Sequence, residues 1–269
     1  MVRNNQPEKQ MKLACVIPLL LLSLVNNPLQ VQAQVAQPIT NRSASTQNNL
    51  SELKFPHNGA PIGRRQGGAR RNGCPNLNQP LTALVPGEET PEESKSFLAL
   101  TVSEYPTFWV YLPQLPTNLR SGEFIFQDES GKDIYRTLVS LPQQAGIIGI
   151  NLPSNPQYAL KTNSKYQWYF KIYCGESQNT SDYFYVKAWI QRVPFNTSLE
   201  SQLKTVKPGK YKVYAVNYLW QDAVTNLAQL RSTNSDSRVL AEDWAKLLEA
   251  VNLEEFAGAS IVGHYNLQR

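Results

Sequence analysis

The strongest constraint on the fold is a series of short β-patterned segments with no helical interval between them. The clearest is Tyr166–Cys174, where apolar residues occupy every second position and Cys174 points to the core. Related segments lie at 97–102, 107–112, 123–127, 134–139, 146–152 and 183–193. Because no helix-length pattern provides parallel crossovers, residues 81–194 are predicted to form an antiparallel, immunoglobulin-like β-sandwich of about seven strands.

After Pro194 the apolar period changes from that of a strand to that of a helix. A capping box at Thr197–Glu200 opens a short helix that ends before Pro208. Two longer amphipathic helices follow, with apolar stripes over 216–230 and 240–251 and a polar turn between them. Since each helix has one apolar side, residues 195–269 are predicted to form an α-helical hairpin packed on the sandwich.

The first 33 residues have the layout of a secretory signal peptide. Two lysines precede an apolar run over 13–25, and Ala33 completes a small-residue cleavage site. About 20 apolar residues are needed to span a bilayer, so a retained anchor is the weaker interpretation. We expect an exported protein, periplasmic or extracellular, with no membrane span after cleavage; Met11 is as good a start as Met1.

Removal of residues 1–33 leaves two cysteines, Cys74 and Cys174. In an oxidising compartment the default for such a pair is one disulfide, and the alternative is two buried free thiols. A bridge between them would close a loop of about 100 residues, which the chain-entropy model values at roughly 4 to 5 kcal/mol.

Two segments without regular periodicity precede the strands. Residues 34–58 are rich in Gln, Asn, Ser and Thr and are predicted to form a disordered spacer. Residues 59–80 are predicted to form a Gly/Arg-rich loop, because five glycines and two prolines interrupt the stretch 59–75.

The positive charge of the chain is concentrated in this loop. The net charge of +5 is modest, and four cations lie within nine residues: Arg64, Arg65, Arg70 and Arg71. Guanidinium groups on a glycine-rich backbone suit a phosphate or carboxylate surface, so these four arginines are the predicted contact with an envelope protein or an anionic polymer. Export argues against nucleic acid as the partner. The alternative is a solvated or internally docked loop.

Exposed aromatic residues provide a third pattern. Tyr169 and Tyr173 lie on the outer face of one predicted strand, and Tyr183, Tyr185 and Trp189 share one face of the next. Such a face can stack sugar rings. The alternative is that other elements cover it, and the C-terminal helices are available for this.

The chain offers little for catalysis or metal binding. His57 and His264 adjoin no nucleophile motif, and no cysteine pair has the spacing of a zinc site. Adjacent acids such as Glu242-Asp243 point apart on a helix or strand and are interpreted as solvated surface. We therefore expect no catalytic residue, no metal and no cofactor. The alternative is a carbohydrate-active or other hydrolase whose distant carboxylates converge in a sandwich cleft.

Several motifs together resemble a known family. They are Gly59–Arg64 with Gly67-Gly68 and Cys74-Pro75, Leu81–Pro86, Tyr105–Pro113, Tyr135-Arg136, Gly146-Ile147, Tyr166–Trp168 with Cys174, Trp220–Ala223, Leu227–Arg231 and Trp244. On these the chain resembles the secreted cyanobacterial family known as domain of unknown function 928. The resemblance implies export into a Gram-negative-type envelope and a shared sandwich with a helical tail. It implies no activity, and we expect a non-enzymatic binding or adaptor module.

Overall fold

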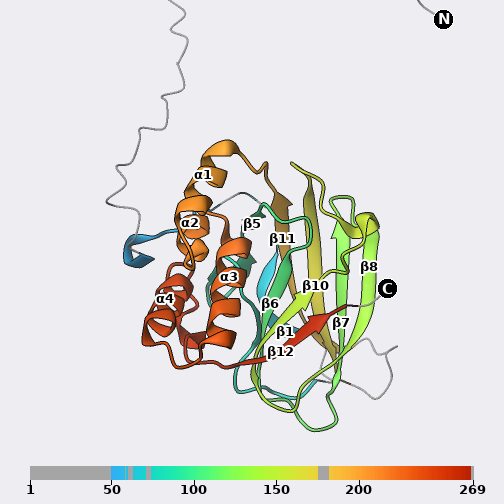
Figure 1. The fold of residues 1–269 in the computed structure, drawn as a ribbon. Helices are drawn as coiled ribbons and strands as arrows, with labels where there is room; N and C mark the ends of the chain where they lie inside the picture. Colours follow the sequence, from blue (N-terminus) through green and yellow to red (C-terminus); the bar gives the residue numbers. More distant parts are fainter. Residues whose placement is uncertain (1–49, 58, 60–62, 71–73, 175–181, 268–269) are drawn as a thin grey trace, which may run out of the picture. The chain divides into compact units, whose positions relative to one another are not determined.

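The structure is a computed structural model that describes residues 50–57, 59, 63–70, 74–174 and 182–267 (Figure 1). For residues 51 and 68–70 it describes the backbone alone. The predicted signal peptide, residues 1–33, and most of the predicted spacer lie outside the described residues.

One ten-stranded sheet dominates the described part of the chain, in the order β12-β9-β6-β2-β1-β11-β10-β7-β8 with β5 beside β11 (Figure 1). Its strands are β1 (Arg64–Arg70), β2 (Leu81–Ala83), β5 (Leu98–Thr101), β6 (Thr107–Leu112), β7 (Ser121–Asp128), β8 (Asp133–Ser140), β9 (Gly146–Asn151), β10 (Lys165–Tyr173), β11 (Tyr183–Arg192) and β12 (Ile261–Asn266). A separate two-stranded sheet pairs β3 (Gly87–Glu89) with β4 (Ser94–Ser96).

Strand β1 connects two halves of the large sheet. One half consists of β12, β9, β6 and β2, and the other of β5, β11, β10, β7 and β8. Arg64 pairs with β11, as do residues 68–70, whereas Gln66 and Gly67 pair with β2. The loop predicted over 59–80 is therefore wrong for 64–70. The glycines permit a strand here because the neighbours approach closely: a Cβ on Gly67 would lie 3.0 Å from the Cβ of Leu81.

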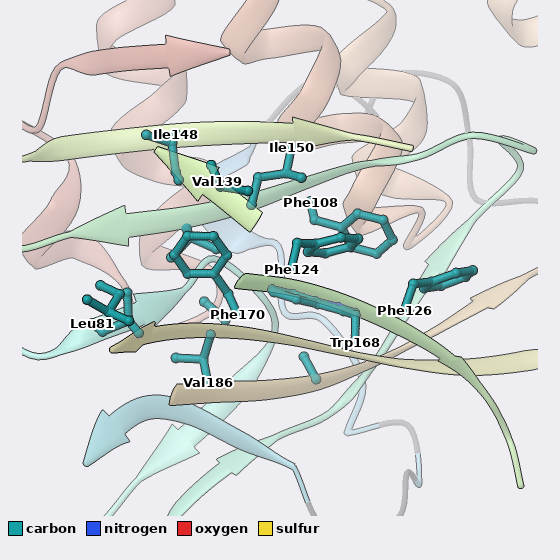
Figure 2. Close-up of a cluster of buried hydrophobic side chains, with 14 of the residues drawn as sticks. Leu81, Phe108, Phe124, Phe126, Val139, Ile148, Ile150, Trp168, Phe170 and Val186 are labelled. Carbon is teal, nitrogen blue, oxygen red and sulfur yellow. The ribbon is translucent and has the colours of Figure 1, made fainter. Parts of the chain in front are cut away.

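The main core lies between the two halves of the sheet, which face each other. Phe108 of β6 contacts Phe124 and Phe126 of β7 and Trp168 of β10, with ring centroids 5.1, 5.8 and 5.2 Å apart (Figure 2). Since the sheet curls far enough to bring these strands together, it is nearly barrel-shaped.

The predicted fold class is thus confirmed as mainly β with C-terminal helices, and it is corrected in two respects. The strands form one ten-stranded sheet that is not clearly a sandwich of seven strands. Two of the pairings, β5 with β11 and β12 with β9, are parallel, so the sheet is not purely antiparallel.

Four helices follow β11 along the chain (Figure 1). They are α1 (Thr197–Thr205), α2 (Lys210–Val216), α3 (Trp220–Thr233) and α4 (Arg238–Glu249), and short 3-10 turns occur at Leu50–Glu52, Pro156–Tyr158 and Glu254–Phe256. The predicted hairpin is confirmed as α3 and α4, with the correction that its first helix begins at Trp220, because Val216 ends α2. Trp220 and Trp244 pack with Trp109, Tyr111 and Ile147 on the outer face of β6 and β9.

The structure corrects three local predictions. The N-cap of α1 is Asn196, whose side chain accepts from the Leu199 amide, so the cap precedes the predicted one by a residue. The predicted spacer contains packed structure within residues 50–57, since Leu50 and Phe55 are buried against the helices. Strand β12 lies in the region predicted to be helical, because its pairing with β9 is a long-range contact that local periodicity does not report.

The predicted disulfide is present. Cys74 and Cys174 are bonded, with their Cα atoms 5.1 Å apart, and the bridge joins the segment after β1 to the end of β10. Both residues pack against the main core. The bond therefore closes a loop of about 100 residues that contains strands from both halves of the sheet.

Candidate functional site

The candidate site lies on the outer face of β7, β10 and β11, while the helices cover the other half of the sheet (Figure 1). A groove of about 450 Å³ runs over this face. We call it the basic groove, and it is lined by Ile125, Gln127, Arg136, Tyr169, Lys171, Tyr183, Tyr185 and Lys187.

Strand register explains why these side chains meet. Arg136 of β8 pairs with Ile125 of β7, Ile125 with Tyr169 of β10, Tyr169 with Lys187 of β11, and Lys187 with Arg64 of β1. Directly paired residues project to the same face of a sheet, so this single row carries three cations and one tyrosine. Arg64 thereby extends the groove by one strand.

Two of the groove cations are partly neutralised by carboxylates. Arg136 Nη1 lies 2.9 Å from Glu123 Oε1, and Lys171 Nζ lies 3.7 Å from Glu123 Oε2. Arg136 Nε also lies 2.7 Å from Asp133, and this hydrogen bond holds the pKa of the Asp133 carboxyl below its usual range. Burial and a hydrogen bond donated to Glu123 raise the pKa of Tyr173. Arg136 and Lys171 therefore retain little uncompensated charge.

Lys187 and Arg64 differ from them, because none of the ion pairs between described residues includes either one. Lys187 Nζ lies 5.5 Å from the centre of the Tyr169 ring, and Arg64 Cζ lies 5.6 Å from that of Tyr185. Cation–π contacts of this kind hold the cations over the rings without cancelling their charge. Like charges directly opposite each other destabilise a sheet. An anion bound between them would relieve that cost.

The four predicted arginine contacts do not act as one set. Arg64 reaches the basic groove, whereas Arg65 points to the opposite face of β1 and is 1% exposed. Its Nε donates to Glu89 at 2.8 Å, and its other nitrogens donate to the carbonyls of Val251 at 2.5 Å and Asn252 at 3.3 Å. Arg65 therefore stabilises the fold through buried hydrogen bonds and is not available to contact a partner.

The other two arginines are less completely placed. The backbone of Arg70 belongs to β1, and its side chain, like the whole of Arg71, lies outside the described residues.

Part of the aromatic face is open to the groove, so the alternative in which the C-terminal helices cover it is wrong for Tyr169, Tyr183 and Tyr185. Tyr169, Tyr183 and Tyr185 are partly exposed and line the groove. Trp189 and Tyr173, at 3% and 8% exposed, are buried and unsuited to stacking. Three of the five predicted aromatic residues thus remain as a platform.

The residues considered for catalysis lie elsewhere. His57 stacks on Phe97, and His264 packs edge-on against Trp109, where burial lowers the pKa of the imidazole. Asp243 is buried, which corrects its interpretation as solvated surface: it accepts a hydrogen bond from Tyr211. Within the described ranges no three His, Cys, Asp or Glu side chains cluster so as to hold a metal ion.

Comparison with known protein families identifies the family of the chain. A family model described as Domain of Unknown Function (DUF928) matches residues 65–261. The chain belongs to this family. The DUF928 match begins in β1 and ends at the first residue of β12, so it includes every residue that lines the basic groove, whereas Arg64 beside the groove lies one position before the match. Searches of the curated proteins and of the solved structures found no match. No helix in the described part of this DUF928 protein is long and apolar enough to cross a membrane.

Proposed function

We propose that this DUF928 protein is a non-enzymatic binding module that contacts an acidic polysaccharide of the cell envelope through the basic groove. The observation that carries the proposal is the pair Lys187 and Arg64, which lie directly opposite each other without an ion-pair partner among the described residues. Open tyrosine rings lie beside both cations. An acidic sugar chain supplies carboxylate or sulfate groups for the cations and ring faces for the tyrosines.

The row of paired side chains extends well beyond the two uncompensated cations at its one end, which favours a polymer over a single small anion. From Arg136 to Arg64 the row crosses from β8 to β1 through β7, β10 and β11. At about 4.8 Å per strand, this amounts to roughly 19 Å. A short oligosaccharide covers such a distance, whereas one phosphate or carboxylate occupies only one end of it.

The location in the envelope rests on different support. The Cys74–Cys174 disulfide is typical of exported proteins, and the sequence before residue 34 has the pattern of a secretory signal. Together with the resemblance to a secreted cyanobacterial family, these features support a periplasmic or extracellular protein. The hydrolase alternative has less support, because the cavity of about 550 Å³ beside α3 is lined by one described carboxylate, Asp222.

The proposal is tested by titrating the full mature chain with polygalacturonate, with neutral dextran as the reference polymer. We expect binding to polygalacturonate that weakens as salt is raised, because the contact is electrostatic. Replacing both unpaired cations, Lys187→Gln with Arg64→Gln, should lower the affinity about tenfold, at somewhat under 1 kcal/mol for each charge. Lys54→Gln, an exposed change near the helices, is the matched control.

Two results would count against this function. One is equal binding of dextran and polygalacturonate, which would remove the need for cations. The other is a double variant that binds polygalacturonate as tightly as the unmodified chain and keeps the same salt dependence.

A further inference from the structure

A second cavity lies where α2 and α3 begin, next to the ends of β5, β6, β9 and β12. It has a volume of about 550 Å³ and shares no lining residue with the basic groove. We call it the polar cleft, because most of its lining consists of neutral Ser, Thr, Asn and Gln side chains. Two opposite charges, Lys210 and Asp222, and two aromatic rings, Tyr105 and Tyr214, complete its chemical character.

Asp222 is the only carboxylate among the described residues that line the polar cleft. Its Oδ2 accepts from the Val102 amide at 3.0 Å, and the Thr101 hydroxyl also donates to the carboxylate. None of the ion pairs between described residues includes Asp222 or Lys210. Burial raises the pKa of Asp222 to about 6, and the hydrogen bonds donated by Val102 and Thr101 offset part of that rise.

Gln221 adds a buried acceptor with no partner. The side chain is 1% exposed and lines the polar cleft, and its amide nitrogen donates to the carbonyl of Thr107. Its Oε1 has no hydrogen-bond partner among the described residues. An unpaired buried oxygen costs free energy that a hydroxyl donor, direct or through a water molecule, would recover.

Other polar groups of the cleft are already fixed in place. Thr107 donates to Asn151 Oδ1 at 2.6 Å, and Asn151 Nδ2 donates to Asn266 Oδ1 at 2.7 Å. Asn226 accepts from the Tyr211 amide at 2.9 Å. Since these contacts hold the amide groups in one orientation, a ligand would meet them without a large ordering cost.

We propose that the polar cleft binds a neutral sugar residue. A sugar offers several hydroxyls that both donate and accept, which matches a lining of amides, hydroxyls and one carboxylate, and it offers a ring face to Tyr105 or Tyr214. The cleft volume falls within the range of roughly 300 to 1,000 Å³ that small-molecule sites occupy. Asp222 and Lys210 carry opposite charges, so the lining has little net charge, which is consistent with a ligand that has no net charge.

The experiment is a calorimetric titration of the full mature chain with three neutral oligosaccharides: cellotetraose, maltotetraose and chitotetraose. We expect at least one of them to bind at millimolar concentration or below. Asp222→Asn keeps an acceptor for the Val102 amide and removes the charged acceptor, and Gln229→Ala removes an exposed lining group from α3. Each change should weaken binding about five- to tenfold.

The matched control is the variant Lys187→Gln with Arg64→Gln in the basic groove, which should bind the neutral sugar as the unmodified chain does. Conversely, Asp222→Asn and Gln229→Ala should leave binding of polygalacturonate unchanged, so failure of one site is distinguishable from failure of the other. Absence of binding by all three oligosaccharides overturns the proposal. Binding that neither cleft variant weakens overturns it as well, because the sugar would then lie elsewhere.

Discussion

Replacement of Arg65 by methionine should destabilise the fold by about 3 to 4 kcal/mol, whereas the same change at the neighbouring Arg64 should cost less than about 0.5 kcal/mol. Methionine fills much of the same volume, so the loss at Arg65 comes from its polar contacts. The guanidinium ties β1 to Glu89 and to the carbonyls of Val251 and Asn252, just beyond the end of α4.

The magnitude follows from what each partner loses. Hydrogen bonds to a charged group contribute about 1.5 to 3 kcal/mol each, and a buried carbonyl left without a donor pays its desolvation cost. Val251 is 4% exposed, so its carbonyl recovers little water. The Glu89 side chain is 23% exposed and rehydrates in part, which places the total near the lower end of the range for broken buried ion pairs.

Equilibrium urea unfolding with the disulfide intact measures both variants, since the chain contains five tryptophans whose fluorescence reports the transition. A double-mutant cycle of Arg65→Met with Glu89→Gln isolates the ion pair and should give a coupling of about 1 kcal/mol. If Arg64→Met and Arg65→Met destabilise the protein equally, the assignment of one arginine to the surface and the other to an internal tie is refuted.

Three further outcomes are expected. Replacing Cys74 and Cys174 by serine should lower stability by at most about 4.7 kcal/mol, the chain-entropy value for a loop of 100 residues, in thermal unfolding. The pKa of Asp222 in the folded chain, about 6, lies above its unfolded value, so the free energy of unfolding should fall as pH rises from 4 to 7. After allowance for partial exposure, we expect a fall of about 2 kcal/mol relative to Asp222→Asn, measured by urea unfolding at each pH. Gly149→Ala should cost about 1 to 3 kcal/mol, because the added Cβ would lie 2.9 Å from the buried Trp109 ring; an unchanged midpoint would contradict this packing.

Much of the secondary structure was predictable because its signals are local. The segment 107–112 coincides with β6, and the predicted strands at 123–127 and 134–139 lie within β7 and β8. Side-chain alternation reports such elements without knowledge of their partners. Strand β1 escaped prediction because its glycines resemble loop residues, and only the approach of β2 and β11 to its backbone makes them suitable for a strand.

The types of residue in the candidate site were predictable, but which individual residues share the groove was not. Basic and aromatic residues were both recognised, yet no local signal joined Arg64 to Tyr185 or separated Arg64 from Arg65. Lys187, which completes the unpaired cation pair, carried no signal of its own in a strand of alternating residues. The polar cleft was not predictable, because Asp222 and Asn151 lie 71 positions apart in the chain and meet only after folding.

By itself the sequence determined the mainly β class, the strands β5 to β11, the α3–α4 hairpin and the cysteine pair, since each depends on short-range periodicity or on a count of residues. The tertiary structure decided how the sheet curls, which of two adjacent arginines faces the groove, and which polar side chains share a cleft. These depend on strand register and on contacts between distant segments, where a shift of one residue moves a side chain to the opposite face.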